Sequence, residues 1–88
     1  MDTASLTTRI ERLAATMGIS KHRINLDFRI YSEEDGGASW SIWSIYAAVP
    51  QKDKRKVDRT LHASGSTPAE AEIEMLECFE RARERGDI

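Results

Sequence analysis

The chain has 88 residues, of which 40% are hydrophobic and 32% charged, and its formal net charge is -2. This composition is typical of one small globular domain and excludes an intrinsically disordered tail. The sequence has no apolar run of membrane-spanning length and no signal-peptide pattern at its start, so we expect a cytoplasmic protein without a membrane partner. A single cysteine, Cys78, fits a reducing compartment and is expected as a small core residue.

The first twenty residues carry the pattern of an amphipathic helix. Its start is open among Thr3, Ser5 and Thr8, because each of these side chains can cap free amides. Gly18 predicts the stop, with Ile19 folding back as the usual apolar contact. The apolar stripe consists of Leu6, Ile10, Leu13, Ala14 and Met17.

Three segments with the period of a β-strand follow. Residues 24–31 alternate apolar and polar side chains, residues 39–49 are apolar on both faces, and residues 57–64 alternate again. The middle segment is therefore expected as the central strand. Residues 33–37 predict a turn, because Asp-Gly-Gly supplies positive φ angles at little cost.

The last quarter of the chain is the clearest helix. Thr67 is a cap, Pro68 suits the first helical position, and Glu70 completes a capping box. Gly86 predicts the C-terminal stop. The expected apolar stripe is Ala69, Ile73, Leu76 and Phe79, widened by Ala71, Met75, Cys78 and Ala82.

These elements predict a single α+β domain over residues 1–88. Short connections favour antiparallel neighbours, so we expect a three-stranded antiparallel meander. The simplest architecture has two layers in the order α-β-β-β-α, with both helices on one face of the sheet.

The central strand carries large apolar side chains on both faces, although two helices can cover only one of them. We place Trp43 in the core, with Ile45, Ala47 and Val49. Trp40, Ile42 and Tyr46 are then exposed, and exposed Trp and Tyr typically mark an interaction surface. We predict that these three residues bind a protein partner or a second copy in a homodimer.

The basic loop at residues 52–56 supports an alternative function, which is nucleic-acid binding. Together with Arg29, Arg59 and the tryptophans, this loop could contact a nucleic-acid phosphate backbone. A solvated loop that guards a sheet edge is the competing interpretation. The candidate nucleic-acid-binding residues are Lys52, Lys54, Arg55, Lys56 and Arg59.

Catalytic and metal-binding patterns are missing from the sequence. His22, His62 and Cys78 belong to no recognisable nucleophile or zinc motif, and the acids at 33–35 lack the spacing of a calcium loop. We therefore expect no enzyme activity, cofactor, metal or small-molecule substrate.

Several stretches resemble known families. Residues 13–24 resemble the core of a helix-turn-helix, which would make Ser20–Arg23 the start of a recognition helix. The element order resembles a double-stranded RNA-binding domain, although the helix positions that hold lysines there hold Pro68, Ala69 and Glu72 here. Residues 34–37 and 65–71 are similar to HicB-type antitoxins. The compact plan also resembles the small accessory proteins of bacteriophages and prophages, which would imply the host cytoplasm.

Overall fold

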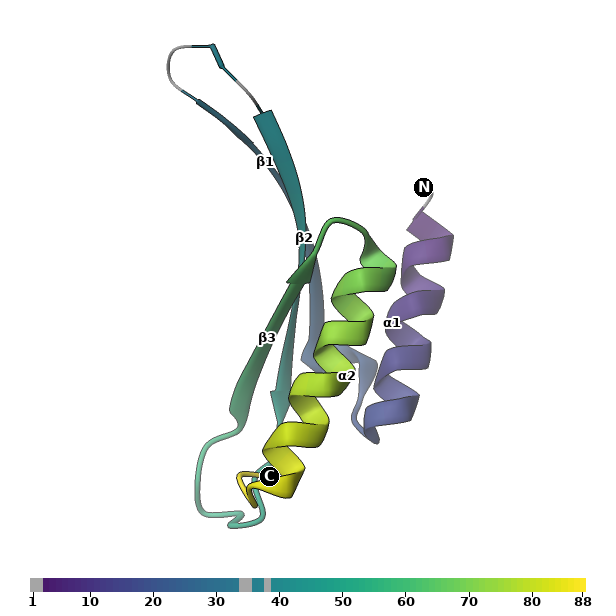
Figure 1. Ribbon diagram of the computed structural model, residues 1–88. Coiled ribbons are helices and arrows are strands. Elements are labelled where there is room, and N and C mark those ends of the chain that lie inside the picture. Colours follow the sequence, from purple (N-terminus) through teal and green to yellow (C-terminus); the bar gives the residue numbers. More distant parts are fainter. Residues whose placement is uncertain (1–2, 34–35, 38) are drawn as a thin grey trace.

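The computed structural model describes residues 3–33, 36–37 and 39–88. Within these residues the elements are the helices α1 (Thr3–Met17) and α2 (Pro68–Glu84) and the strands β1 (Ile24–Ser32), β2 (Ser39–Val49) and β3 (Arg59–Gly65). The strands form an antiparallel sheet in the order β1-β2-β3, and both helices cover the same face of it (Figure 1). The predicted fold class is confirmed.

Helix α2 begins and ends as its sequence indicates. Thr67 Oγ1 accepts a hydrogen bond from the Glu70 N–H at 3.1 Å, and the Glu70 carboxylate accepts one from the Ser66 N–H at 2.8 Å. The reciprocal bond thus reaches one residue further back than in a standard capping box. At the other end Gly86 has φ 76°, and the Asp87 N–H donates to the Ala82 carbonyl at 2.9 Å, which closes a Schellman motif.

Helix α1 starts at Thr3, the earliest of the three candidate positions, and ends in the same kind of motif. Gly18 has φ 70°, and the Ile19 N–H donates to the Ala14 carbonyl at 3.0 Å. No second helix follows, because Lys21–Arg23 forms one 3-10 turn and β1 starts at Ile24. The helix-turn-helix resemblance is therefore wrong, and the period-two pattern from residue 24 determines the structure instead.

The core lies between the sheet and the two helices, and it confirms which face of β2 is buried. Ile45 is 2% exposed, Ala47 0% and Val49 4%, whereas Trp43 is half-buried against the same cluster. Met75 of α2 is the large side chain that is completely enclosed. The buried apolar residues are Leu13, Ala14, Met17, Ile24, Ile45, Ala47, Val49, Leu61, Ala63, Ala71, Met75, Phe79 and Ala82.

The predicted apolar stripe of α2 is rotated relative to the observed one. Ile73 is 60% exposed, Ala69 is exposed and Leu76 is half-buried, while the sheet-facing side consists of Pro68, Ala71, Met75, Phe79 and Ala82. The tight entry into the helix explains the rotation. A Cβ on Gly65 would lie 2.7 Å from the Ala71 nitrogen, so the end of β3 lies directly against the first turn of α2 on the side of Ala71.

Strand β3 starts at Arg59 and not at Val57, which is 84% exposed. The preceding residues are held as a loop. The Gln51 side chain donates to the Val57 carbonyl at 2.8 Å, and the Asp58 carboxylate is ion-paired with Arg23. These local bonds replace the strand pairing that the alternation at 57–58 predicted.

The β1–β2 hairpin extends well beyond the rest of the sheet. Strand β3 pairs with β2 only from Val49 to Trp43, so residues 29–32 and 39–42 pair with each other alone. We call these two segments the arm; it projects above both helices in Figure 1. The radius of gyration is 14.8 Å, against about 12 Å for a compact chain of this length.

The predicted turn at 33–37 falls partly on residues 34–35, which lie outside the described residues. Of the rest, Gly36 has φ 77°, and its N–H donates to the Glu33 carbonyl at 3.2 Å. Glycine is favoured at such a positive φ because it carries no Cβ.

Candidate functional site

The face of the sheet opposite the helices is the candidate site, and we call it the helix-free face. Because side chains alternate along a strand and the register is continuous, one set of alternating positions on each strand shares this face. Its residues are Asn25, Asp27, Arg29 and Tyr31 from β1, Trp40, Ile42, Ser44, Tyr46 and Ala48 from β2, and Thr60, His62 and Ser64 from β3.

Two stacked ring pairs mark the two ends of this face. On the arm, Tyr31 and Trp40 stack with centroids 5.4 Å apart and an interplanar angle of 15°. On the body, Tyr46 and His62 stack at 4.6 Å and 11°. Trp40 is 54% exposed and Tyr31 39%, whereas Tyr46 and the intervening Ile42 are half-buried. The arm therefore presents the larger exposed apolar area.

The charged groups on the helix-free face nearly cancel. An Arg29 guanidinium nitrogen lies 3.7 Å from an Asp27 carboxylate oxygen on the same strand. The pKa of Arg29 is raised above its usual value. The largest cause is a side-chain hydrogen bond with Tyr31, and the electrostatic interactions with Tyr31 and with Asp27 contribute less. With one acid and one arginine paired on it, the face is amphipathic but close to neutral.

The structure places the predicted residues Trp40, Ile42 and Tyr46 on one face, as the strand alternation indicated. The sequence reasoning missed Tyr31 and His62, which complete the two stacks. Alternation alone puts Tyr31 on the polar side of β1. Pairing it with Trp40 also requires the hairpin register, which the short Gly-rich turn could have suggested.

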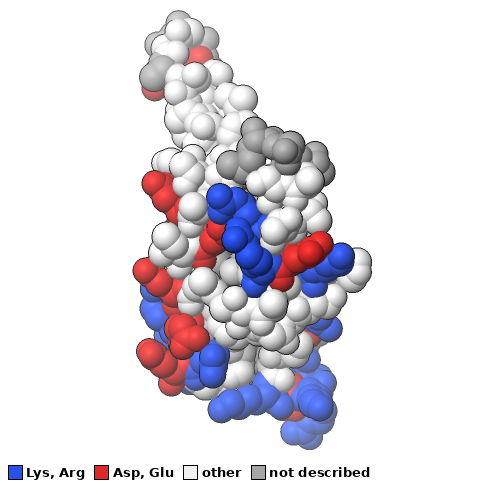
Figure 2. All heavy atoms as spheres, turned by 90° about the vertical axis from the view of Figure 1, so that its right-hand side faces the viewer, with Lys and Arg blue, Asp and Glu red and all other residues white. Residues whose placement is uncertain are grey.

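The basic residues lie elsewhere. Lys52, Lys54, Arg55 and Lys56 are exposed in the loop between β2 and β3. This loop is at the opposite end of β2 from Trp40, roughly 30 Å away at the rise of a β-strand. Figure 2 shows Lys and Arg gathered at that end, while the arm is largely uncharged in this view. The loop and the exposed tryptophan do not form one continuous site.

Arg59 does not extend the basic loop onto the helix-free face. It is opposite Val49 in the register and so points to the helix side, where its guanidinium lies 3.8 Å from the Asp87 carboxylate. Within the loop, Arg55 lies 3.1 Å from Asp53. The side-chain hydrogen bond from Arg55, and then its backbone N–H, lower the pKa of the Asp53 carboxyl.

Among the residues that the structure describes, no three His, Cys, Asp or Glu side chains are grouped as a metal site would need. The Cys78 thiol is half-buried and lies 3.8 Å from the His62 carbonyl, across the α2–β3 interface. No helix in the described part of the chain has the length and apolar character to cross a membrane.

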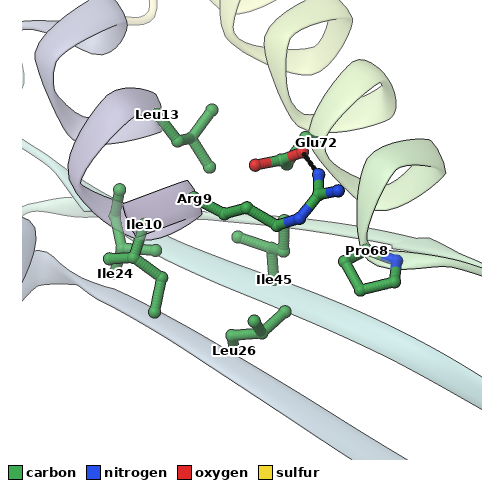
Figure 3. Close-up of a pocket in the computed structure, with 8 residues that line it drawn as sticks. All are labelled: Arg9, Ile10, Leu13, Ile24, Leu26, Ile45, Pro68 and Glu72. Atoms are coloured by element: carbon green, nitrogen blue, oxygen red, sulfur yellow. Dashed lines mark hydrogen bonds and ion pairs between the residues drawn. The ribbon is translucent and has the colours of Figure 1, made fainter. Parts of the chain in front are cut away.

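Figure 3 shows a hollow between the two helices and the sheet, lined mainly by apolar side chains. Its volume of about 10 Å³ would hold at most a single water molecule. Above it the Arg9 guanidinium lies 2.7 Å from the Glu72 carboxylate and ties α1 to α2. The hollow is a packing feature and is too small for a ligand.

A larger, open hollow of about 430 Å³ lies at the basic end, next to Val49, Phe79 and Ile88. Both arginines that line it already have acidic partners, Arg23 with Asp58 and Arg83 with Glu80.

Comparison of the chain with protein-family models, with curated protein sequences and with solved structures finds no match. The resemblances to RNA-binding domains, antitoxins and phage accessory proteins stay predictions.

Proposed function

We propose that this protein is a non-enzymatic interaction module that binds another protein chain through its helix-free face. The observation that carries the proposal is the Tyr31–Trp40 stack, which is exposed on a projecting arm. Exposed Trp and Tyr side chains are the groups from which protein interfaces draw most of their binding energy. Ile42 and Tyr46 continue the apolar surface along β2 toward the body.

The charge distribution favours a protein over a nucleic acid at this face. Aromatic side chains that stack on bases are normally accompanied by a positively charged groove that follows the phosphates. Here Arg29, the arginine beside the stack, is ion-paired with Asp27 at 3.7 Å, so the local net charge is close to zero. An amphipathic, nearly neutral aromatic surface fits the mixed core and rim of a protein interface.

A pair of matched variants tests the proposal. Trp40→Ser removes an exposed ring from the helix-free face, and Ile73→Ser removes an exposed apolar side chain from the outer side of α2; both are more than half exposed. The wild type and both variants are immobilised and used to capture proteins from the cells that make them. We expect a partner that the wild type and Ile73→Ser retain and that Trp40→Ser loses.

Sedimentation of the purified proteins completes the experiment. A wild-type dimer that Trp40→Ser dissociates would identify a second copy as the partner of this face. Identical capture by Trp40→Ser and the wild type, together with identical sedimentation, would contradict the proposal. Trp43→Ser serves as the folding control, because the half-buried Trp43 packs against the core and its loss should lower the melting temperature.

A second candidate function is supported by the basic end of the molecule. Four exposed basic side chains occupy the loop between β2 and β3, which also holds two acids, Asp53 and Asp58. Such a cluster binds nucleic acid with an affinity that falls as salt rises. If this function is real, a mobility shift should show salt-sensitive retention that disappears in the triple variant Lys54→Gln, Arg55→Gln, Lys56→Gln, while folding is unchanged. If the triple variant still retains nucleic acid, the loop is not the binding site.

A further inference from the structure

Strand β1 has one long edge with no partner among the described residues. It is the first strand of the sheet order and pairs with β2 over all of its nine residues, without a bulge. Edge strands are commonly protected from pairing with another chain by a bulge, a proline, charged side chains or a covering helix or loop. Strand β1 has no bulge and no proline, and its two charged residues, Asp27 and Arg29, have opposite signs. Its helix-side residues Phe28 and Ile30 are 47% and 68% exposed.

The residues of β1 are complementary to themselves in an antiparallel pairing centred on Phe28. In that register Asp27 is opposite the second copy's Arg29, and Leu26 is opposite the second copy's Ile30. Phe28 meets its own copy at the two-fold axis. Opposite charges and apolar pairs that face each other across strands stabilise a sheet. The Arg29–Asp27 contact within each strand would join both copies in one alternating cluster of four charges.

The neighbouring registers are unfavourable. Centring the pairing on Asp27 would set two carboxylates directly opposite each other, and centring it on Arg29 would do the same with two guanidinium groups. Shifts by one residue would align the helix side of one copy with the helix-free face of the other. The pattern of charges therefore selects one register.

The molecule is more extended than a compact chain of its size. Its accessible surface is 6047 Å², whereas a compact protein of 10.0 kDa is expected to expose about 5,200 Å². The arm accounts for the elongated outline (Figure 1).

The helix side of the pairing is also apolar. The arm of the second copy would run along the lower half of β1, which brings its Ile30 next to Leu26. Leu26 and Ile10 of α1 are half-buried and line the small hollow shown in Figure 3. An exposed side chain of one copy thus meets a partly covered apolar surface of the other.

We propose that two copies of this protein pair along β1, in the antiparallel register centred on Phe28, to form a continuous six-stranded sheet. The proposal concerns the edge of the sheet and goes beyond the proposed function. It leaves the helix-free faces of both copies exposed side by side, so failure of either proposal does not affect the other.

Charge reversal tests the interface. Asp27→Arg or Arg29→Asp alone sets like charges opposite each other twice in the dimer, and we expect each to raise the dissociation constant about tenfold. The double variant Asp27→Arg, Arg29→Asp restores opposite charges and should restore the wild-type constant. Glu74→Lys, at an exposed position of α2, is the control and should leave the dissociation constant unchanged. Sedimentation reports the constant, and circular dichroism confirms that each variant is folded.

Cross-linking tests the register in a Cys78→Ser background. With the two-fold axis at Phe28, Phe28→Cys places two sulfurs within reach of a disulfide. Ser32→Cys places them about 26 Å apart at the rise of a β-strand. We expect mild oxidation to link the first variant and not the second. Linkage of Ser32→Cys alone would overturn the register.

Other outcomes would overturn the pairing itself. A wild-type chain that stays monomeric at every concentration, or a dimer that neither single reversal weakens, excludes β1 as the interface. A dimer that is lost with Trp40→Ser but kept with Asp27→Arg would lie on the helix-free face, so the proposed function would stand and the edge pairing would not.

Discussion

At the scale of single residues, Met75 and Ile73 lie on the same helix but should contribute very differently to the free energy of unfolding. Met75 is 0% exposed between α2 and the sheet, whereas Ile73 is 60% exposed on the outer side. Met75→Ala should cost about 2–5 kcal/mol of unfolding free energy, because it leaves a cavity that the neighbouring side chains fill only in part. Ile73→Ala should change it by no more than about 0.5 kcal/mol.

Denaturant unfolding of both variants measures the difference as a shift in the midpoint at constant slope. Equal losses for Met75→Ala and Ile73→Ala would mean that α2 packs with another rotation. The sequence could not separate these two residues, since both fit a stripe with 3–4 spacing. Only the position of α2 over β3 decides which of them is enclosed.

Gly65 is the residue that sets this position. A Cβ there would lie 2.7 Å from the Ala71 nitrogen and 2.7 Å from the Glu70 Cβ. Because the nitrogen is part of the helix backbone, it cannot move aside as a flexible side chain would. Gly65→Ala should therefore destabilise the fold by about 1–3 kcal/mol, the usual cost of overpacking.

The neighbouring Ser64→Ala variant is the matched control, because Ser64 points to the helix-free face and meets no helix. Thermal melting should show a clear decrease for Gly65→Ala and almost none for Ser64→Ala. If both melt like the wild type, the helix is not seated on Gly65.

At the scale of elements, the helix termini were the most predictable features of the chain. Capping depends on a few adjacent residues, so the sequence alone identified Thr67, Gly18 and Gly86, and the observed bonds agree. The start of β3 was not predictable in the same way. The alternation of residues 57–64 continues across its boundary, and the bonds that end the strand come from Gln51 and Arg23 elsewhere in the chain.

The cap of α2 gives a prediction at this scale. The Thr67 hydroxyl accepts the Glu70 N–H at 3.1 Å, and its loss leaves that amide without its capping partner. Thr67→Ala should lower the unfolding free energy by about 1 kcal/mol. Ser66→Ala is the control, since Ser66 contributes its backbone N–H to the Glu70 carboxylate and keeps it in the variant. A Thr67→Ala protein as stable as Ser66→Ala would show that the hydroxyl does not cap the helix.

At the scale of the whole molecule, the main unpredicted feature is the arm. The alternation of both strands was visible in the sequence, and it identified Trp40, Ile42 and Tyr46 as one face. The length of β3 decides how far the hairpin projects, and β3 stops at Gly65, where the chain leaves the sheet to enter α2 at Pro68. How far β3 pairs along β2 depends on contacts between segments that are distant in the sequence, so no local sequence pattern predicts the arm.

Removing the arm separates the body of the fold from its proposed interaction surfaces. All the buried core residues lie outside positions 29–42, and Phe28 pairs directly with Trp43 at the base of the arm. Replacing 29–42 with Asn-Gly would close this pair with a two-residue hairpin turn, for which Asn-Gly is favoured. We expect the shortened chain to keep its helical signal and to melt cooperatively within a few degrees of the wild type.

The same variant lacks Tyr31, Trp40 and Ile42 of the helix-free face, as well as Arg29 and Ile30 of the β1 edge. It should therefore capture no partner and sediment as a monomer, because both proposed surfaces depend on the arm. Retained capture or dimerisation in a folded, shortened chain would place the interaction on the helices or the basic end. Loss of cooperative melting would instead show that the exposed hairpin stabilises the body, contrary to the burial of the core residues.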